Sequence, residues 1–266
     1  MMNGLLYLLF LLISFLASVA GAICGIGGGV LIKPALDAFG VMSVSAISFL
    51  SGCTVLAMSC YSMLKNKMSG ESLVDAKTGT PLAIGAAVGG VAGKLMFQYI
   101  SGLFASKETV GAVQAGCLLV ITLGTLIYTV KKDKIVTLRI SSTAACLGIG
   151  VVLGIFSSFL GIGGGPINLV VLFYFFSMKT KEAAQNSLYI ILFSQITSLL
   201  STLLTGTVPE FSYLLLVMMV AGGICGGAVG RKVNKKIDAG IVDRLFIFLM
   251  IVIIGINIYN ICRFMA

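Results

Sequence analysis

Apolar runs of about 20 residues recur from one end of the chain to the other, and each is long enough to cross a bilayer. They include residues 5–23, 111–130, 188–204 and 245–261. Of the 266 residues, 58% are hydrophobic and only 10% are charged, against about 25% charged residues in soluble domains. The longest polar stretch, residues 65–80, is short enough to be a loop. We therefore expect an all-α, polytopic transmembrane helical bundle that forms a single domain over residues 1–266.

The chain also repeats three glycine-rich motifs in the same order. Gly25-Ile26-Gly27-Gly28-Gly29 recurs letter for letter at residues 161–165. The glycine pattern of residues 85–94 recurs at 222–231, and that of residues 124–132 recurs at 255–263. The differences in residue number are nearly constant, 161 − 25 = 136, 222 − 85 = 137 and 255 − 124 = 131. We predict two internal repeats of one unit, over about residues 1–135 and about residues 136–266.

The positive charges indicate how the two repeats are oriented, because Lys and Arg collect in cytoplasmic loops. With four spanning helices in each repeat, the loop charges divide evenly between the two sides. If the triple glycines break the chain, residues 30–41 and 166–177 are extra short segments, each repeat has five segments, and the second repeat is inverted. One side of the membrane then collects Lys65, Lys67, Lys77, Lys131, Lys132, Lys134, Arg139, Lys179, Lys181, Arg231, Lys232, Lys235, Lys236 and Arg244. The other side keeps only Lys107 and Arg263, with Lys33 and Lys94 inside segments.

We therefore predict two inverted repeats of about five segments each. The protein is expected to cross the cell inner membrane several times, with both termini on the outer side. Net charge is +9, and this excess indicates orientation rather than a nucleic-acid partner. The two short segments, about 18 to 24 Å long as helices, cannot cross about 30 Å of hydrocarbon. The glycine hairpins should then lie at mid-membrane, which is tolerated only where they face protein or a wet cavity.

The glycine tips are the first candidate substrate site, formed by Gly27, Gly28, Gly29, Gly163, Gly164 and Gly165. Glycine lets the backbone turn without a Cβ clash, so Gly28 and Gly164 are expected in conformations that other residues avoid. Each tip leads into a helix whose free N–H groups and positive dipole end suit an anion. Pro166 suits such a helix start. The alternative is that the glycines only allow close helix packing, as the motifs at residues 85–93 and 222–230 suggest.

These two Gly-Ile-Gly-Gly-Gly hairpins, each followed by a short helix and a small-polar segment, resemble the TauE/SafE sulfite exporter family, also called TSUP. The resemblance covers nearly the whole chain. It implies a membrane transporter, commonly an exporter, of small sulfur-containing anions such as sulfite, thiosulfate or organosulfonates. The alternatives are a transporter of another small anion such as a carboxylate, or a noncatalytic membrane assembly subunit.

Polar residues inside the apolar segments are further candidates, because such groups are costly in lipid and usually functional. Ser51 and Ser187 match at the same offset as the Gly-Ile-Gly-Gly-Gly motifs, and Asn186 precedes Ser187. Their hydroxyls and amide are candidates to bind the oxygens of an anion, with helix capping as the alternative. Gln195 is a less specific candidate, since hydrogen bonding between helices explains it equally well.

Lys33 stands four positions after Gly29, on a segment expected in the membrane. It either attracts the substrate or forms a structural ion pair with Asp37, its i,i+4 neighbour. Lys94 and Arg231 match across the repeats and are expected near helix ends at the interface.

The absence of histidine and the shortage of acidic residues exclude several classes of protein. His-based zinc sites and Ser-His chemistry are excluded, and an acid–base pair for an intramembrane enzyme is missing. We expect no enzyme activity, no cofactor and no metal. The expected partners are a small anionic substrate and the lipid bilayer, with a homodimer left open. Uncoupled efflux driven by the membrane potential is the simplest mechanism, because only Asp37 is a candidate intramembrane carboxylate.

Overall fold

The computed structural model describes residues 4–104 and 107–265. Over these residues the chain forms ten α-helices and one 3-10 turn at Lys132–Lys134. The helices are α1 (Gly4–Cys24), α2 (Gly29–Phe39), α3 (Val44–Met68), α4 (Ala76–Leu103), α5 (Lys107–Lys131), α6 (Thr143–Phe159), α7 (Pro166–Phe176), α8 (Thr180–Leu204), α9 (Tyr213–Lys236) and α10 (Ala239–Met265). Seven of them are long and apolar enough to cross a membrane. The expected polytopic all-α bundle is confirmed.

The short segments expected after the glycine motifs are also confirmed. Helices α2 and α7 have 11 residues each, which corresponds to about 16 Å of helix. Neither can cross the hydrocarbon core alone. The first five helices fall in the first predicted repeat and the last five in the second, while the inverted relation of the repeats stays a prediction.

Helices α3 and α8, which the predicted repeat pairs with each other, end in the same way. Gly70 after α3 and Gly206 after α8 both adopt the left-handed conformation, with φ of 67° and 64°. The next residue then donates its amide to a carbonyl in the last turn of the helix. Glu71 donates to the Asn66 carbonyl at 3.0 Å, and Thr207 donates to the Thr202 carbonyl at 3.2 Å. This is the glycine-terminated helix end called a Schellman motif.

The closest helix pairs join one half of the chain to the other. Helix α9 packs along α1, and α4 packs along α6. A Cβ added to Gly226 would lie 2.4 Å from the Phe15 carbonyl oxygen, and one added to Gly89 would lie 2.1 Å from that of Val151. The glycines at residues 85–93 and 222–230 therefore allow backbones to approach closely, as their spacing predicts.

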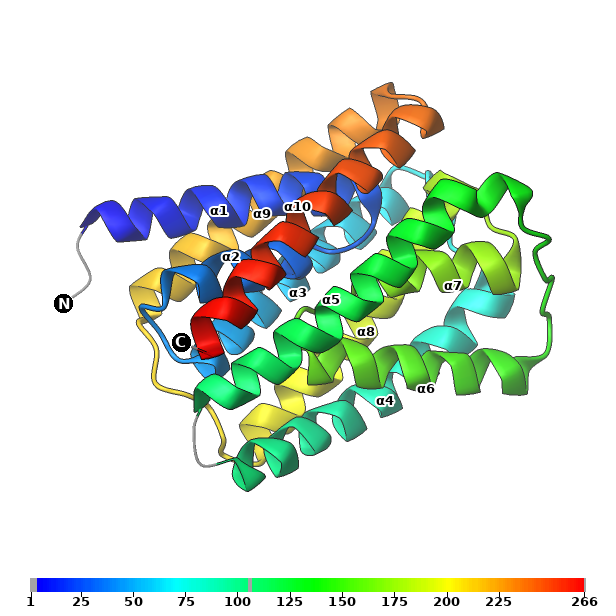
Figure 1. Ribbon diagram of the computed structural model, residues 1–266. Coiled ribbons are helices and arrows are strands. Elements are labelled where there is room, and N and C mark those ends of the chain that lie inside the picture. The colour runs from blue at the N-terminus through cyan, green and yellow to red at the C-terminus, as the bar shows by residue number, and fades with distance from the viewer. Residues whose placement is uncertain (1–3, 105–106, 266) are drawn as a thin grey trace.

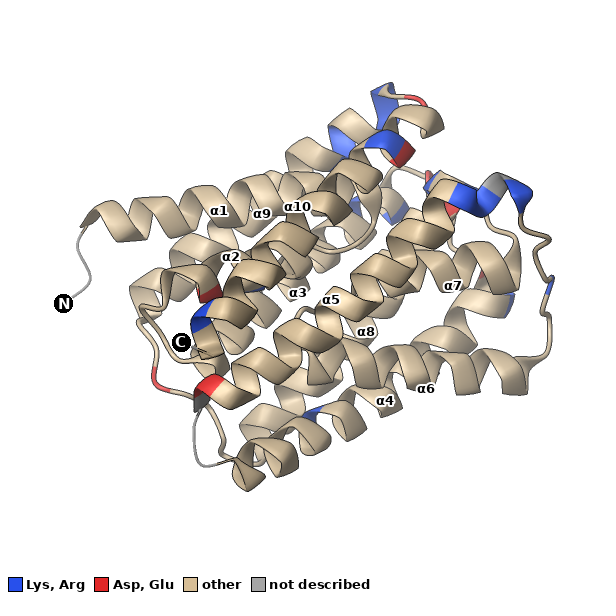
Figure 2. Ribbon diagram, in the orientation of Figure 1, with Lys and Arg blue, Asp and Glu red and all other residues tan. Residues whose placement is uncertain are grey.

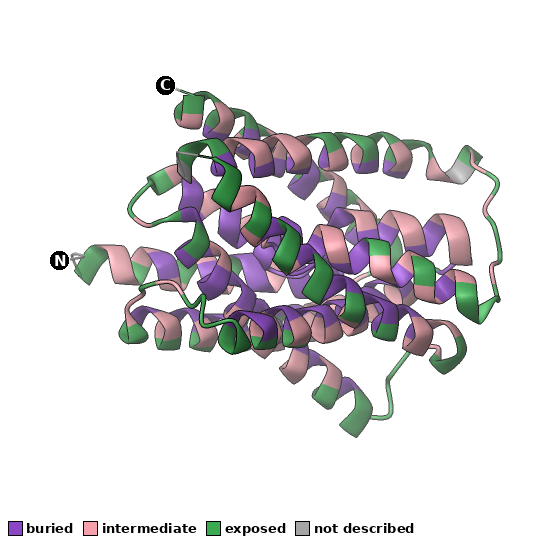
Figure 3. Cartoon of the chain, turned by 90° about the horizontal axis from the view of Figure 1, so that it is seen from below, coloured by how far each residue is buried: buried purple, intermediate pink, exposed green. Residues whose placement is uncertain are grey.

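Helices α1 and α9 form one side of the bundle, α4 and α6 form the opposite side, and α3, α5 and α8 lie between them (Figure 1). Helix α1 and helix α6 begin at opposite ends of the bundle, and α1 begins at the same end at which α10 finishes (Figure 1). Exposed residues lie on the outer faces of the helices and buried residues in the centre (Figure 3). The outer faces carry large apolar side chains such as Leu12 and Leu16, as lipid contact requires.

Charged side chains are distributed unequally between the two ends of the bundle. Lys and Arg gather at the end where α5 and α9 finish, and the end where α1 begins has few of them (Figure 2). This separation agrees with the grouping of charges in the five-plus-five arrangement. Which end faces the cytoplasm stays a prediction.

Candidate functional site

The first glycine tip joins α1 to α2 inside the protein. Gly25 and Gly27 adopt φ of 77° and 71°, a left-handed conformation that favours glycine. Helix α2 then begins at Gly29, where the amides of Leu31 and Ile32 donate to the Gly28 carbonyl. Within the described residues, the buried amides of Gly28 and Gly29 make no hydrogen bond. They form the positive end of the α2 dipole.

The second tip joins α6 to α7 with a similar path. Gly161 and Gly163 have φ of 65° and 71°, and Gly164 has φ of 122°. Gly165 and Pro166 then start α7, as expected for a proline at the first helical position. The amides of Gly163, Gly164 and Gly165 make no hydrogen bond to any described residue.

The two tips differ at their central glycine. Gly164 is left-handed as expected, but Gly28 has φ of −67° and ψ of −24°, which any residue adopts. The expectation that Gly28 needs a conformation closed to other residues is therefore wrong. Space limits this position instead, because a Cβ on Gly28 would lie 2.9 Å from the Ser18 Oγ.

The structure brings the two tips together. A Cβ on Gly29 would lie 2.0 Å from the Ile162 carbonyl oxygen, and one on Gly27 would lie 3.8 Å from that of Gly163. Two helix starts with unpaired amides thus lie in contact inside the bundle, with carbonyl oxygens of the second tip against the glycines of the first. Free amides at a helix start are donors of the kind that bind anions.

Gln195 is one of the polar candidates that lie beside the tips. A Cβ on Gly163 would lie 2.8 Å from the Gln195 Nε2. Asn186 is used elsewhere, because its Nδ2 donates to the carbonyls of Leu73 at 3.1 Å and Glu182 at 3.0 Å. Asn186 therefore holds the loop between α3 and α4.

Ser51 and Ser187 are fully buried, and neither hydroxyl has a partner among the described residues. Capping does not explain them, since α3 begins at Val44 and α8 begins at Thr180. Each serine stands one helical turn before a side chain that contacts the first tip, Val55 or Ile191.

Lys33 forms the buried ion pair that its spacing to Asp37 predicts. The two charged atoms are 2.7 Å apart, and the residues are 3% and 5% exposed. Arg263 of α10 donates to the Asp37 carbonyl at 2.6 Å, and Asn260 donates to that of Pro34 at 2.9 Å. These contacts hold the carboxyl end of α2. The Lys33 side chain also lies beside the second tip, because a Cβ on Gly161 would lie 3.5 Å from the Lys33 Cε.

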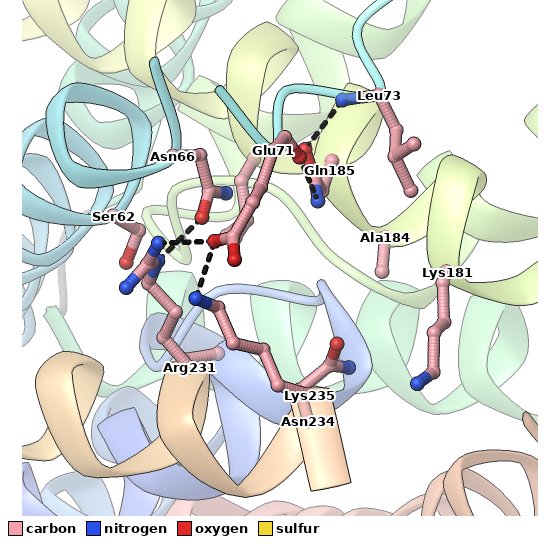
Figure 4. Close-up of a pocket in the computed structure, with 12 residues that line it drawn as sticks. Ser62, Asn66, Glu71, Leu73, Lys181, Ala184, Gln185, Arg231, Asn234 and Lys235 are labelled. Carbon is pink, nitrogen blue, oxygen red and sulfur yellow. Dashed lines mark hydrogen bonds and ion pairs between the residues drawn. The ribbon is translucent and has the colours of Figure 1, made fainter. Parts of the chain in front are cut away.

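A cavity of about 470 Å³ lies at the Lys- and Arg-rich end of the bundle (Figure 4). We call it the vestibule. Its lining comes from α1, α3, the loop between α3 and α4, α8 and α9, and includes Ala22, Ser62, Asn66, Glu71, Lys181, Ala184, Gln185, Arg231, Asn234 and Lys235. One lining residue of the vestibule, Ala184, contacts the first tip, because a Cβ on Gly25 would lie 2.2 Å from the Ala184 Cα.

Two cations pair with one carboxylate in the vestibule, and Lys181 adds a third cation to its lining. The Glu71 side chain pairs with Arg231 at 2.7 Å and with Lys235, and Arg231 also binds Asn66 (Figure 4). The hydrogen bond from Lys235 holds the pKa of the Glu71 carboxyl below its usual value, and the charges of Lys235 and Arg231 add to this effect. Lys181 makes no ion pair with any described residue. The vestibule is therefore net positive and attracts anions.

A second, much smaller cavity of about 20 Å³ lies on the other side of the tips. We call it the inner cavity, and its lining includes Ser48, Lys94, Phe97, Gln114, Ser158, Gly161, Gln195, Ser198 and Thr202. The expectation that Lys94 lies near a helix end is wrong, because it lines this cavity while α4 continues to Leu103. Arg231 does lie toward the end of α9, where it lines the vestibule. The match of Lys94 with Arg231 across the predicted repeats is one sequence signal that relates the two cavities.

Over the described residues the chain forms ten helices, two of which, α2 and α7, begin at buried glycine tips. With seven helices long enough to span a membrane and a basic vestibule, this is the architecture of a polytopic membrane transporter. The sequence pattern of the family described as Sulfite exporter TauE/SafE matches residues 10–258, so this chain belongs to the TauE/SafE family.

Several relatives are similar along nearly their whole length. The "Probable membrane transporter protein YunE" of Bacillus subtilis is 24% identical and covers 93% of this chain and 95% of its own. A "Probable membrane transporter protein" of Haemophilus influenzae is 26% identical over 95% of this chain and 97% of its own. No solved structure matches the chain at a significant level.

Proposed function

We propose that this protein exports small sulfur-containing anions, such as sulfite, thiosulfate or organosulfonates, and that it binds them between the two glycine tips. One observation carries the proposal: two buried helix starts with unpaired amides, at Gly28 and Gly29 and at Gly163 to Gly165, lie against each other. Helix starts of this kind bind anions without a cation in direct contact. Sulfur oxyanions offer several acceptor oxygens to such a site.

The charge distribution supports the direction of transport. The vestibule is net positive and opens at the Lys- and Arg-rich end, which the positive-inside rule assigns to the cytoplasm. An anion arriving from the cytoplasm then meets Arg231, Lys235 and Lys181 before it reaches the tips. Export of one negative charge gains about 2.3 kcal/mol per 100 mV when the interior is negative.

We infer that the two halves are inverted copies, with both termini outside the inner membrane. The opposite starts of α1 and α6 support this relation, as do the matched helix ends at Gly70 and Gly206. Inverted copies bring both tips to the middle of the bilayer, where the anion is bound halfway across.

A flux assay tests the substrate class. Purified protein is placed in proteoliposomes loaded with sulfite, thiosulfate, methanesulfonate or acetate, and release is measured under one imposed potential. We expect release of the sulfur anions, with competition among them, and little release of acetate. Release of acetate alone would contradict the substrate class, and no release of any anion would favour an assembly subunit.

A further inference from the structure

The contacts of the two tips are exchanged between the halves of the chain. The first tip lies against α8, where a Cβ on Gly25 would meet Ala184. The second tip lies against α3, where a Cβ on Gly161 would lie 2.5 Å from the Ser48 Oγ. Gly161 is the counterpart of Gly25 (161 − 25 = 136), and Ala184 is the counterpart of Ser48 at the same offset (184 − 48 = 136). Ser48 of α3 thus supports the second tip, and its counterpart Ala184 of α8 supports the first tip.

The linings of the two cavities are related by the same offset. Ser62 and Asn66 line the vestibule, and their counterparts Ser198 and Thr202 line the inner cavity. The cation of each cavity also has a counterpart, because Arg231 matches Lys94 in the second repeated glycine motif. The two cavities are thus one kind of site that occurs once on each side of the tips.

Matched contacts also connect a loop to a helix beside each cavity. At the vestibule, Glu71 after α3 binds Lys235 of α9. At the inner cavity, Gln98 of α4 donates to the Thr207 Oγ1 after α8, at 2.6 Å. Thr207 is the counterpart of Glu71 at the offset of the first glycine motif (207 − 71 = 136). Lys235 is the counterpart of Gln98 at the offset of the second motif (235 − 98 = 137). The same junction is ionic on one side of the protein and neutral on the other.

The two cavities differ in volume. The vestibule has about 470 Å³, whereas the inner cavity has about 20 Å³, room for about one water molecule. The Lys94 ammonium lies 5.3 Å from the centre of the Phe97 ring and makes no ion pair with any described residue. The buried hydroxyls of Ser48 and Ser158 also lack partners within the described part of the chain. A cation and unpaired donors thus surround a space that is too small for an anion.

We propose that the inner cavity is a second anion site, with Lys94 as its cation, and that it opens to the face opposite the vestibule when the vestibule closes. This inference rests on the proposed transport function and deepens it. The ligand is a small oxyanion, which takes hydrogen bonds from Ser48 and Ser158 and the charge of Lys94. The described conformation is open toward the vestibule and closed at the inner cavity.

Cysteine accessibility tests the opening of the inner cavity. Ser62→Cys and Ser198→Cys are each made in a background without native cysteines and treated with a membrane-impermeant thiol reagent from either face of oriented vesicles. We expect Ser62→Cys to react only from the Lys- and Arg-rich face and Ser198→Cys only from the opposite face. Ser201→Cys, on the same helix but outside both cavities, is the matched control and should not react. Failure of Ser198→Cys to react, or its reaction from the Lys- and Arg-rich face, would overturn the proposal.

Protection by an anion tests the role of Lys94. Methanesulfonate, which does not react with thiols, should slow labelling of Ser198→Cys several-fold. Lys94→Gln should remove this protection, Lys94→Arg should keep it, and Lys236→Gln, an exposed lysine outside both cavities, should not change it. Protection that persists in Lys94→Gln would exclude Lys94 as the cation. Labelling reports access whatever anion is carried, so its failure is distinguishable from a wrong substrate class in the flux assay.

Discussion

Gly27 and Gly163 have the same left-handed backbone, with φ of 71° in both. A residue with a Cβ costs about 1–2 kcal/mol in this conformation. At Gly163 there is a second obstacle, because the Cβ would lie 2.8 Å from the Gln195 Nε2. The two glycines are therefore required by the backbone path that exposes the amides of the tips.

We expect Gly27→Ala and Gly163→Ala to reduce anion flux by roughly five- to thirty-fold, the change in population that one or two kcal/mol produces. Flux is measured in proteoliposomes at matched protein content. Gly116→Ala is the control, since a Cβ at Gly116 of α5 has no neighbour within 4 Å. Normal flux in both tip variants would mean that the amides of the tips do not bind the anion.

The Lys33–Asp37 pair allows a double-mutant test of structure against function. Lys33→Leu leaves Asp37 buried without its partner, so we expect a loss of stability of about 3–5 kcal/mol. In Lys33→Leu/Asp37→Leu both charges are gone, and most of the stability should return. Thermal unfolding in detergent measures both variants.

If the pair is structural, the double variant also transports anions with an unchanged half-saturating concentration. A double variant that is stable but binds the anion several-fold more weakly would show that Lys33 acts on the substrate.

At the scale of elements, the loop between α3 and α4 is attached to α9 by Glu71. The lowered pKa of Glu71 means that this attachment stabilises the protein above the ordinary glutamate pKa of about 4.3 and is lost as the pH falls through the lowered value. We expect the unfolding temperature to fall on acidification through this range, and to fall less in Glu71→Gln. Glu210→Gln, in the exposed loop between α8 and α9, is the control and should behave as the unchanged protein does. Equal acid sensitivity in all three proteins would remove Glu71 as the titrating group.

The elements of the fold could be predicted closely from the sequence because glycine and charge act locally. The triple glycines indicated the starts of α2 and α7, which lie at Gly29 and Pro166. The conformation of Gly28 could not be predicted, since glycine adopts left- and right-handed backbones with similar ease. The role of Asn186 was also missed, because the loop that it binds belongs to the other half of the chain.

At the scale of the whole molecule, the distribution of charge predicts the topology. Cysteine tags at either terminus and at position 107 should be labelled from outside intact cells, and tags at positions 65, 132 and 235 only after the cells are opened. Equal expression of the tagged proteins is the control. Labelling of positions 107 and 235 from the same side would contradict the inverted arrangement of five plus five segments.

The vestibule was the part of the site that the sequence analysis missed. It is built from five separate parts of the chain, and Glu71 and Lys235 meet only after α3, α4 and α9 have packed. The sequence does hold a signal, since Ser62 and Asn66 match Ser198 and Thr202 at the offset of the glycine motifs. That match becomes informative once the structure shows that both pairs line cavities.

We propose that the protein carries sulfur oxyanions through the paired tips and that the membrane potential drives their efflux. The most direct test is sulfite efflux from proteoliposomes under an imposed potential, without a proton or sodium gradient. An interior-negative potential should accelerate efflux, and about 100 mV should support roughly fifty-fold accumulation of a monovalent anion outside. Efflux that ignores the potential and stops when a pH gradient is removed would contradict this account.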